Sequence, residues 1–170
     1  MTGALADGWL GTCFVPDEPE AHLAFLRKGA ESAGRTLEDL TLCVDATLAI
    51  TDQPEQVYPL AKAQMAFQLS AMGSPTMNFY NDAYARGGFS EACQEVRNLW
   101  LKNRRDDAIA AVPDEMIEKT MIIGDESHVR SRIKQYREAG ITDLMLHPVA
   151  PTTEGKLDVL GRAIELAREG

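Results

Sequence analysis

The chain has little positive charge, because its 17 lysines and arginines face 26 aspartates and glutamates and leave a net charge of −9. Nucleic acids and anionic membranes bind to basic surfaces, so neither is expected as a main partner. No apolar run reaches the length of a membrane span. The opening residues 1–7 also lack the basic region and long apolar stretch of a signal peptide, so we expect a cytoplasmic protein.

Cysteine is scarce, and strong catalytic motifs are missing. Cys13, Cys43 and Cys93 are odd in number, far apart and without C-x-x-C spacing, which favours reduced thiols over disulfides. The acidic pairs have no histidine or cysteine at metal-ligand spacing, so no metal site is expected. There is no P-loop, G-x-S-x-G, H-E-x-x-H or strand-following G-x-G-x-x-G. Kinase, serine hydrolase and zinc protease functions therefore have little support.

The composition that remains is that of one globular domain over residues 1–170, with 45% hydrophobic and 25% charged residues. Its clearest unit is 127–149. Val129, Ile133 and Tyr136 recur at helical spacing, Gly140 stands where a helix ends, and 141–146 is a short apolar strand. A helix that leads into a strand through one glycine is the repeating half of a parallel α/β fold.

Two further strands are predicted at 9–15 and 40–50, with a helix between them that begins at 16–19 and ends at Gly34. Residues 52 to about 120 are too long for an ordinary connection and are predicted to be a helical insertion. Its helices are expected at 54–72, 90–102, 105–111 and 114–119, with an aromatic-containing loop at 73–89, and a terminal helix is expected at 157–168. Insertions at strand ends tend to carry specificity.

The strands alternate in a way that indicates a barrel. Leu42, Val44 and the other even positions of 40–50 make an aliphatic face, whereas Asp45 and Thr47 lie on a mixed face, as does His147 on the last strand. Three parallel strands joined by crossovers do not close a sheet. In a (β/α)8 barrel the aliphatic face meets the helices and the mixed face lines the interior. The predicted fold is therefore α/β, a partial TIM barrel with its last three strands, surrounding helices and a helical insertion.

Candidate site residues follow from this geometry, because the carboxyl ends of barrel strands carry the active site. His147 and Asp45 are the candidate catalytic residues. His147 either lines the pocket or bonds nearby backbone, and a mid-strand carboxylate such as Asp45 is more often a satisfied interior group than a base. Thr12 and Thr47 are candidate cofactor contacts. Tyr80 either covers a flat ring system or anchors its loop.

Four stretches resemble the bacterial-luciferase-like superfamily, and within it the coenzyme F420-dependent oxidoreductases: G-A-L-A-D-G-W, A-E-S-A-G-R, A-I-T-D and G-D-E-S-H-V-R-S-R-I-K-Q-Y-R-E-A-G-I-T-D-L-M-L-H-P. The resemblance implies a TIM barrel of roughly twice this length, of which this chain is the C-terminal half. It also implies F420, or alternatively FMN, with the main cofactor-binding residues upstream. Members that oxidise sugar phosphates place a basic residue where this chain has Cys13-Phe14-Val15, so the resemblance does not extend to that substrate.

The resemblance implies hydride transfer to or from a small organic substrate, by an oxidoreductase or monooxygenase that is inactive as an isolated chain unless a second polypeptide supplies the first five strands. The alternative is a non-catalytic α/β module stabilised by self-association, because unpaired parallel edges invite strand addition. Homo-oligomerisation or association with the missing barrel half is the expected partnership. An independent flavodoxin-like domain has less support, since no phosphate-binding loop follows any predicted strand.

Overall fold

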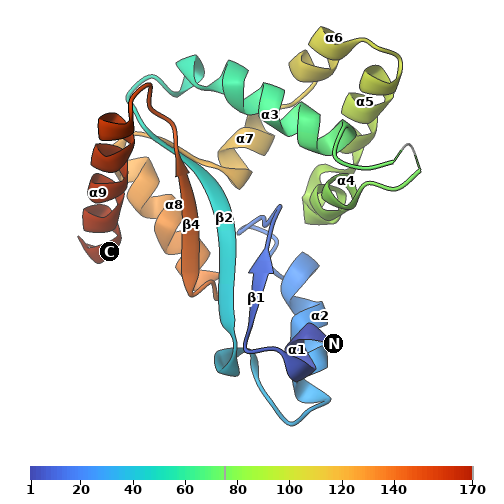
Figure 1. Cartoon of the computed structure of the whole chain (residues 1–170), viewed down its shortest axis with the longest axis vertical. Helices are drawn as coiled ribbons and strands as arrows, with labels where there is room; N and C mark the ends of the chain where they lie inside the picture. The colour runs from blue at the N-terminus through green and yellow to red at the C-terminus, as the bar shows by residue number, and fades with distance from the viewer. Residues whose placement is uncertain (75, 170) are drawn as a thin grey trace.

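The computed structural model describes residues 1–74 and 76–169. Within this range four strands form one parallel sheet: β1 (Gly8–Gly11), β2 (Thr41–Ile50), β3 (Ile122–Gly124) and β4 (Asp143–Pro148) (Figure 1). β1 pairs with residues 41–44 of β2, β3 with residues 48–50 and β4 with residues 43–48. Each of the other three strands therefore pairs with β2, which is the centre of the sheet.

The backbone hydrogen bonds show which edge of β2 each strand occupies. The N–H groups of Thr41 and Thr51 donate to the residue before β1 and to the last residue of β3, at 3.0 and 2.8 Å. The carbonyl groups of Leu42 and Leu48 accept from residues on either side of β4, at 2.9 and 2.8 Å. Successive backbone groups of a strand point to opposite edges. β1 and β3 thus share one edge of β2, and β4 has the other.

The parallel α/β sheet confirms the predicted fold class, but the strand boundaries differ in three places. β1 ends at Gly11 rather than at residue 15, because Cys13 has a φ of 61° and turns the chain out of the sheet. β4 runs from Asp143 to Pro148 rather than over 141–146. β3 was not predicted, since three residues are too few to show an alternating pattern.

The helices fall into two groups, of which the first belongs to the strand–helix units: α1 (Thr2–Leu5), α2 (Glu20–Glu31), a 3₁₀ turn (Leu37–Asp39), α8 (Glu126–Glu138) and α9 (Thr153–Glu169). The insertion holds a 3₁₀ turn (Pro54–Gln56), α3 (Tyr58–Ser70), α4 (Phe79–Tyr84), a π-helical turn (Ala85–Phe89), α5 (Ser90–Leu101), α6 (Arg105–Ala110) and α7 (Asp114–Thr120). The predicted loop at 73–89 was therefore wrong in part. The side chain of Asn78 starts α4 there by accepting from the N–H of Asn81 at 3.1 Å.

The aliphatic face of β2 packs against helices, as the alternation predicted. Its even-numbered residues share a core with α2, α8 and α9, in which Leu42 and Leu48 are fully buried. Burial of a leucine side chain contributes about 1.5–3 kcal/mol to folding. The helices supply Leu23, Leu26, Ala30, Val129, Ile133, Tyr136, Ala163 and Leu166. This face of the sheet is closed to ligands.

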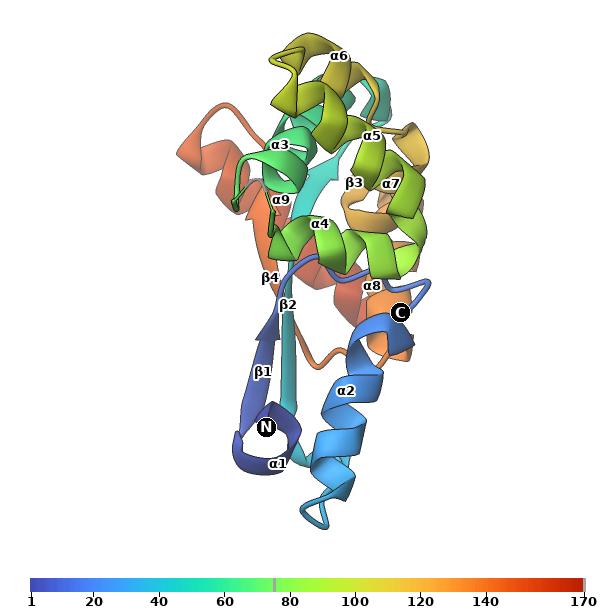
Figure 2. The same ribbon diagram turned by 90° about the vertical axis from the view of Figure 1, so that its right-hand side faces the viewer.

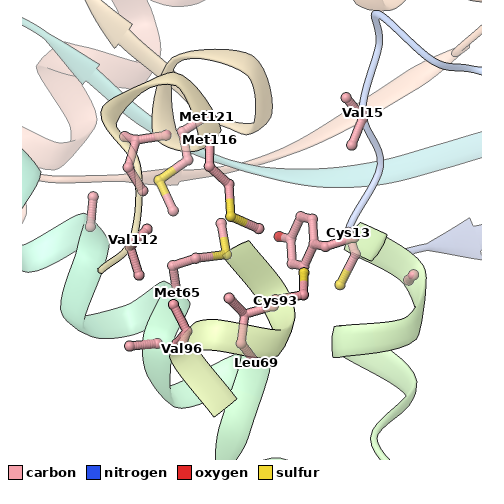
Figure 3. Packing of buried hydrophobic residues seen from close by; sticks show 14 of the residues in the cluster. Cys13, Val15, Met65, Leu69, Cys93, Val96, Val112, Met116 and Met121 are labelled. Atoms are coloured by element: carbon pink, nitrogen blue, oxygen red, sulfur yellow. The ribbon is translucent and has the colours of Figure 1, made fainter. Parts of the chain in front are cut away.

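The insertion has a second core, rich in sulfur. Met65, Met116, Met121 and Cys93 gather in it with aliphatic side chains (Figure 3). Methionine is unbranched and flexible, so it fills the irregular gaps between short helices. The insertion helices gather beyond the end toward which the strands point (Figures 1 and 2), and Ala49 near the end of β2 belongs to the same core. The insertion is thereby packed onto the carboxyl ends of the strands.

A buried histidine lies in the helix that follows β1. His22 of α2 is 8% exposed, and its ring is 6.2 Å from that of Trp9 and 5.7 Å from that of Phe14. Its Nε2 has no hydrogen-bond partner among the described residues. Burial lowers the pKa of His22 below its ordinary 6.5, and the positive charge of Arg86 lowers it further. The folded chain therefore favours the neutral imidazole.

His22 is expected to make the protein less stable in mild acid. Because the folded pKa is below the unfolded value of 6.5, stability is fully present above pH 6.5 and is lost as the pH falls through the folded pKa. His22→Phe keeps an aromatic ring at this position and removes the titratable imidazole. Urea unfolding at about pH 7.5 and about pH 5 should show a smaller loss of unfolding free energy for the variant. An equal loss in both proteins would contradict the assignment.

Candidate active site

The mixed face of the sheet is open to solvent along β4. Met145 is 44% exposed and the His147 side chain 54%, while Leu10 of β1 is also exposed on this face. The helices α2, α8 and α9 pack on the opposite face. A ligand can therefore approach Met145 and His147 of β4 directly, whereas Thr47 and Ala49 of β2 are buried.

An acid–base pair lies on this face, at the carboxyl-terminal part of the strands. His147 pairs in register with Thr47. Its Nε2 is 3.7 Å from Oδ2 of Asp45, which lies two residues before Thr47 on the same face of β2. The Asp45 side chain is 27% exposed, so both groups are accessible. At this distance the two side chains are neighbours but do not form a strong hydrogen bond. An imidazole beside a carboxylate can hold or release a proton toward a ligand on the open face.

A small cavity of about 20 Å³ adjoins Asp45 and Thr47, where the insertion meets the strand ends. Cys13 and Tyr84 both line it. Burial raises the pKa of the Cys13 thiol to about 11 and that of the Tyr84 hydroxyl well above its ordinary value. Both groups are therefore neutral near pH 7, and Cys13 is a hydrogen-bonding group rather than a nucleophile.

The structure brings four of the five predicted residues to one end of the sheet. His147, Asp45 and Thr47 are neighbours on the open face, and Thr12 reaches the cavity through Cys13, with its hydroxyl 3.7 Å from the thiol. Tyr80 lies apart, in α4. Its ring contacts Phe79 edge to face at 5.8 Å and packs against the core of the insertion.

Among the other residues that line the cavity, Gln64 and Gln68 were not predicted. Gln64 and Gln68 are four residues apart on α3, and this spacing places them on one side of a helix. That signal is present in the sequence, but it does not show that this side of α3 faces the sheet. Only the packing of the insertion brings these residues to Asp45.

A larger and more open cavity, of about 590 Å³, lies beyond the ends of β2 and β3. Asp52, Glu118 and Asp125 line it, and the Tyr58 hydroxyl donates to Glu118 at 3.1 Å. Its acidic lining disfavours an anionic ligand. Over residues 1–74 and 76–169, no three histidine, cysteine, aspartate or glutamate side chains converge as metal ligands. In the same part of the chain, no helix combines the length and apolarity needed to cross a membrane.

Comparison with known proteins places these features in a family. Residues 1–143 match the family model of the luciferase-like monooxygenases. The chain is 30% identical over 148 residues to a Mycobacterium tuberculosis protein assigned to the coenzyme F420-dependent oxidoreductases, covering 86% of this chain and 43% of that protein. It is 26% identical over 164 residues to the 5,10-methylenetetrahydromethanopterin reductase of Methanopyrus kandleri, covering 95% of this chain and 45% of the reductase.

Solved structures agree with the sequence matches. The coenzyme F420-dependent tetrahydromethanopterin reductase of M. kandleri superposes with a TM-score of 0.67 at 25% identity, over 97% of this chain and 44% of the reductase. An F420-dependent secondary alcohol dehydrogenase, solved with an F420–acetone adduct, has the same fold with a TM-score of 0.60 at 15% identity. The chain spans less than half the length of each of these proteins. It belongs to the luciferase-like monooxygenase family and has the fold of part of that family's (β/α)8 barrel.

Proposed function

We propose that the chain is the C-terminal portion of an F420-dependent oxidoreductase that transfers hydride to or from a small organic substrate. The observation that carries the proposal is the His147–Asp45 pair, in which His147 near the carboxyl end of β4 lies beside Asp45 in the middle of β2 on the open face. The F420-dependent relatives support this cofactor over FMN, the alternative. The open face is then one wall of an active site whose other walls belong to the rest of the barrel.

The residues present suit only one part of F420. The face that exposes Leu10 and Met145 can contact a flat ring, since it offers apolar surface. The cofactor's phosphate tail needs donors or cations, whereas the two cavities at this end have acidic residues and, in the part of the chain described, no lysine or arginine in their lining. The tail is thus assigned to strands outside this chain.

The chain's own contribution is to accept and return the proton that accompanies hydride transfer. When bound, F420 supplies the carbon that takes or gives the hydride. Oxidation of an alcohol to a carbonyl releases a proton as well, and we assign this proton to Nδ1 of His147, because Nε2 faces the Asp45 carboxylate. Asp45 stabilises the imidazolium that results, at 3.7 Å. In the reverse direction the imidazolium returns the proton to the carbonyl oxygen.

Activity is expected to require the missing part of the barrel. The purified 170-residue chain should give no measurable reduction of F420, followed by the loss of its absorbance. A chimera in which this chain replaces the matching 43% of the mycobacterial relative should bind F420 and reduce it with a small alcohol. Turnover by the isolated, mass-verified chain would refute the first expectation. A folded chimera that binds no F420 would refute the proposed function.

The exposed apolar residues of the open face favour a second candidate, a non-catalytic module stabilised by self-association. Leu10 and Met145 would be buried between copies. Light scattering after size-exclusion chromatography distinguishes the two candidates. A stable dimer that becomes monomeric in Met145→Lys, together with an inactive chimera, would favour the module. If the original chain and the Met145→Lys variant are both monomeric, the self-associating module is refuted.

A further inference from the structure

The candidate active site has a second wall, built by α3 of the insertion, that the proton chemistry does not use. Gln64 and Gln68 line the 20 Å³ cavity from this helix, opposite Asp45 and Thr47 of β2. The two glutamines are one helical turn apart, so their amide groups lie on the same side of α3. Two amides and one carboxylate thus converge on a single small space.

The amide groups of this wall have unused hydrogen-bonding capacity. Neither the Gln64 nor the Gln68 side chain makes a hydrogen bond to another residue in the part of the chain described. Each amide offers two N–H donors and one acceptor oxygen. Gln64 is exposed and Gln68 half-buried, so water can reach both amides and a ligand in the cavity can displace it.

The helix that carries the glutamines is held firmly by its neighbours. The Asn78 side chain donates to the backbone carbonyl of Gln68 at 3.1 Å. Asn81 is buried, and its side-chain amide donates to the carbonyls of Leu69 and Cys93 at 3.0 and 2.9 Å, which ties α3 to α4 and α5. The side of α3 that faces the cavity is therefore set before any ligand binds, which lowers the entropic cost of binding.

Size and charge limit what the cavity accepts. A volume of about 20 Å³ admits one water-sized group, such as a single oxygen with its hydrogen. The Asp45 carboxylate is on the wall, and no lysine or arginine of the described residues lines it. A carboxylate or phosphate would be repelled there, while a hydroxyl can donate to Asp45 and accept from an amide.

We infer that Gln64 and Gln68 are the specificity-determining residues of this site, and that they hold a neutral hydroxyl or amide group of the substrate, which donates its hydrogen to Asp45. That the bound molecule is a substrate rests on the proposed function. The binding itself needs neither cofactor nor turnover. The substrate class that follows is a small neutral alcohol or amide rather than an acid or a phosphate ester.

Titration of the whole 170-residue chain by NMR tests the inference, with acetamide, 2-propanol and acetate as probes. The side-chain amide signals of Gln64 and Gln68 should shift saturably with acetamide and 2-propanol, with a Kd on the order of 10 mM for such small probes. Acetate should bind at least about tenfold more weakly, because it meets Asp45. Acetate binding as tight as acetamide binding would overturn the assigned chemistry.

Substitutions test whether the amide groups of Gln64 and Gln68, rather than other parts of the protein, bind the probe. Gln64→Leu and Gln68→Leu should each weaken acetamide binding by about tenfold, the effect of one lost hydrogen bond. Gln94→Leu makes the same change at an exposed position of α5 and should leave binding unchanged. Binding that survives in the double variant would refute the inference. A failed chimera with intact acetamide binding would refute only the proposed function.

Discussion

Asp45→Asn in the chimera is expected to lower kcat by about 100-fold or more while KM changes by less than about threefold. Asparagine has the shape of aspartate without its charge. The neutral amide cannot stabilise the imidazolium of His147, which lies 3.7 Å away and is assigned to receive the proton. Because the charge develops only during proton transfer, its loss affects the chemical step more than substrate binding.

Steady-state kinetics over a range of pH measure this effect, with Asp143→Asn as the matched control. Asp143 is on the same face of the sheet at the opposite end of β4, where its carboxylate accepts from Thr142 at 2.7 Å. The control should keep kcat within about twofold, since its charge is remote from the proton. Equal losses in both variants would show that Asp45 acts through the general charge of this face, and would contradict its role beside His147.

Leu48→Ala is expected to reduce the free energy of unfolding by about 3 kcal/mol. Leu48 is fully buried and lies where β2 pairs with both β3 and β4, so the lost methyl groups leave a cavity that the fixed strands cannot close. Urea unfolding followed by circular dichroism measures the change. The dependence on urea concentration should stay the same, because the folded and unfolded states expose similar surface.

A leucine on the protein surface is the control for this substitution. Leu157 of α9 is 64% exposed, and Leu157→Ala should change stability by less than about 0.5 kcal/mol. A loss at Leu48 no larger than that at Leu157 would show that the aliphatic face of β2 is not the core of the sheet. It would also remove the basis for placing Asp45 and His147 on the opposite, open face.

The alternation of residues 40–50 was enough to predict the faces of the central strand, because a strand places successive side chains on opposite sides. The same rule put Asp45 and His147 on one face, although it gave no distance between them. β3 was missed because Ile122–Gly124 is shorter than two alternations. The early end of β1 depends on the positive φ of Cys13, a conformation that a residue other than glycine rarely adopts.

Most helices of the insertion were predictable, although α4 was not, and their orientation was not. The apolar and polar residues of α3 indicate a helix, yet part of its docking depends on Asn78 and Asn81, whose side chains bond backbone carbonyls in other segments. Such bonds join residues that no local pattern relates. For this reason Gln64 and Gln68 are part of the candidate site only once the tertiary structure is known.

The central position of β2 has a consequence for how the protein folds. β2 reaches its partner β4 only across the whole insertion, and the Thr142 hydroxyl that accepts from the N–H of Leu42 is 100 residues away along the chain. Contacts over such a separation form slowly, because a long loop must close first. During synthesis, the short helices between β2 and β4 can form and pack locally before β4 is available to pair with β2. The pairing of β2 with β4 is therefore expected to form late, with closure of this long loop rather than formation of the short helices limiting its rate.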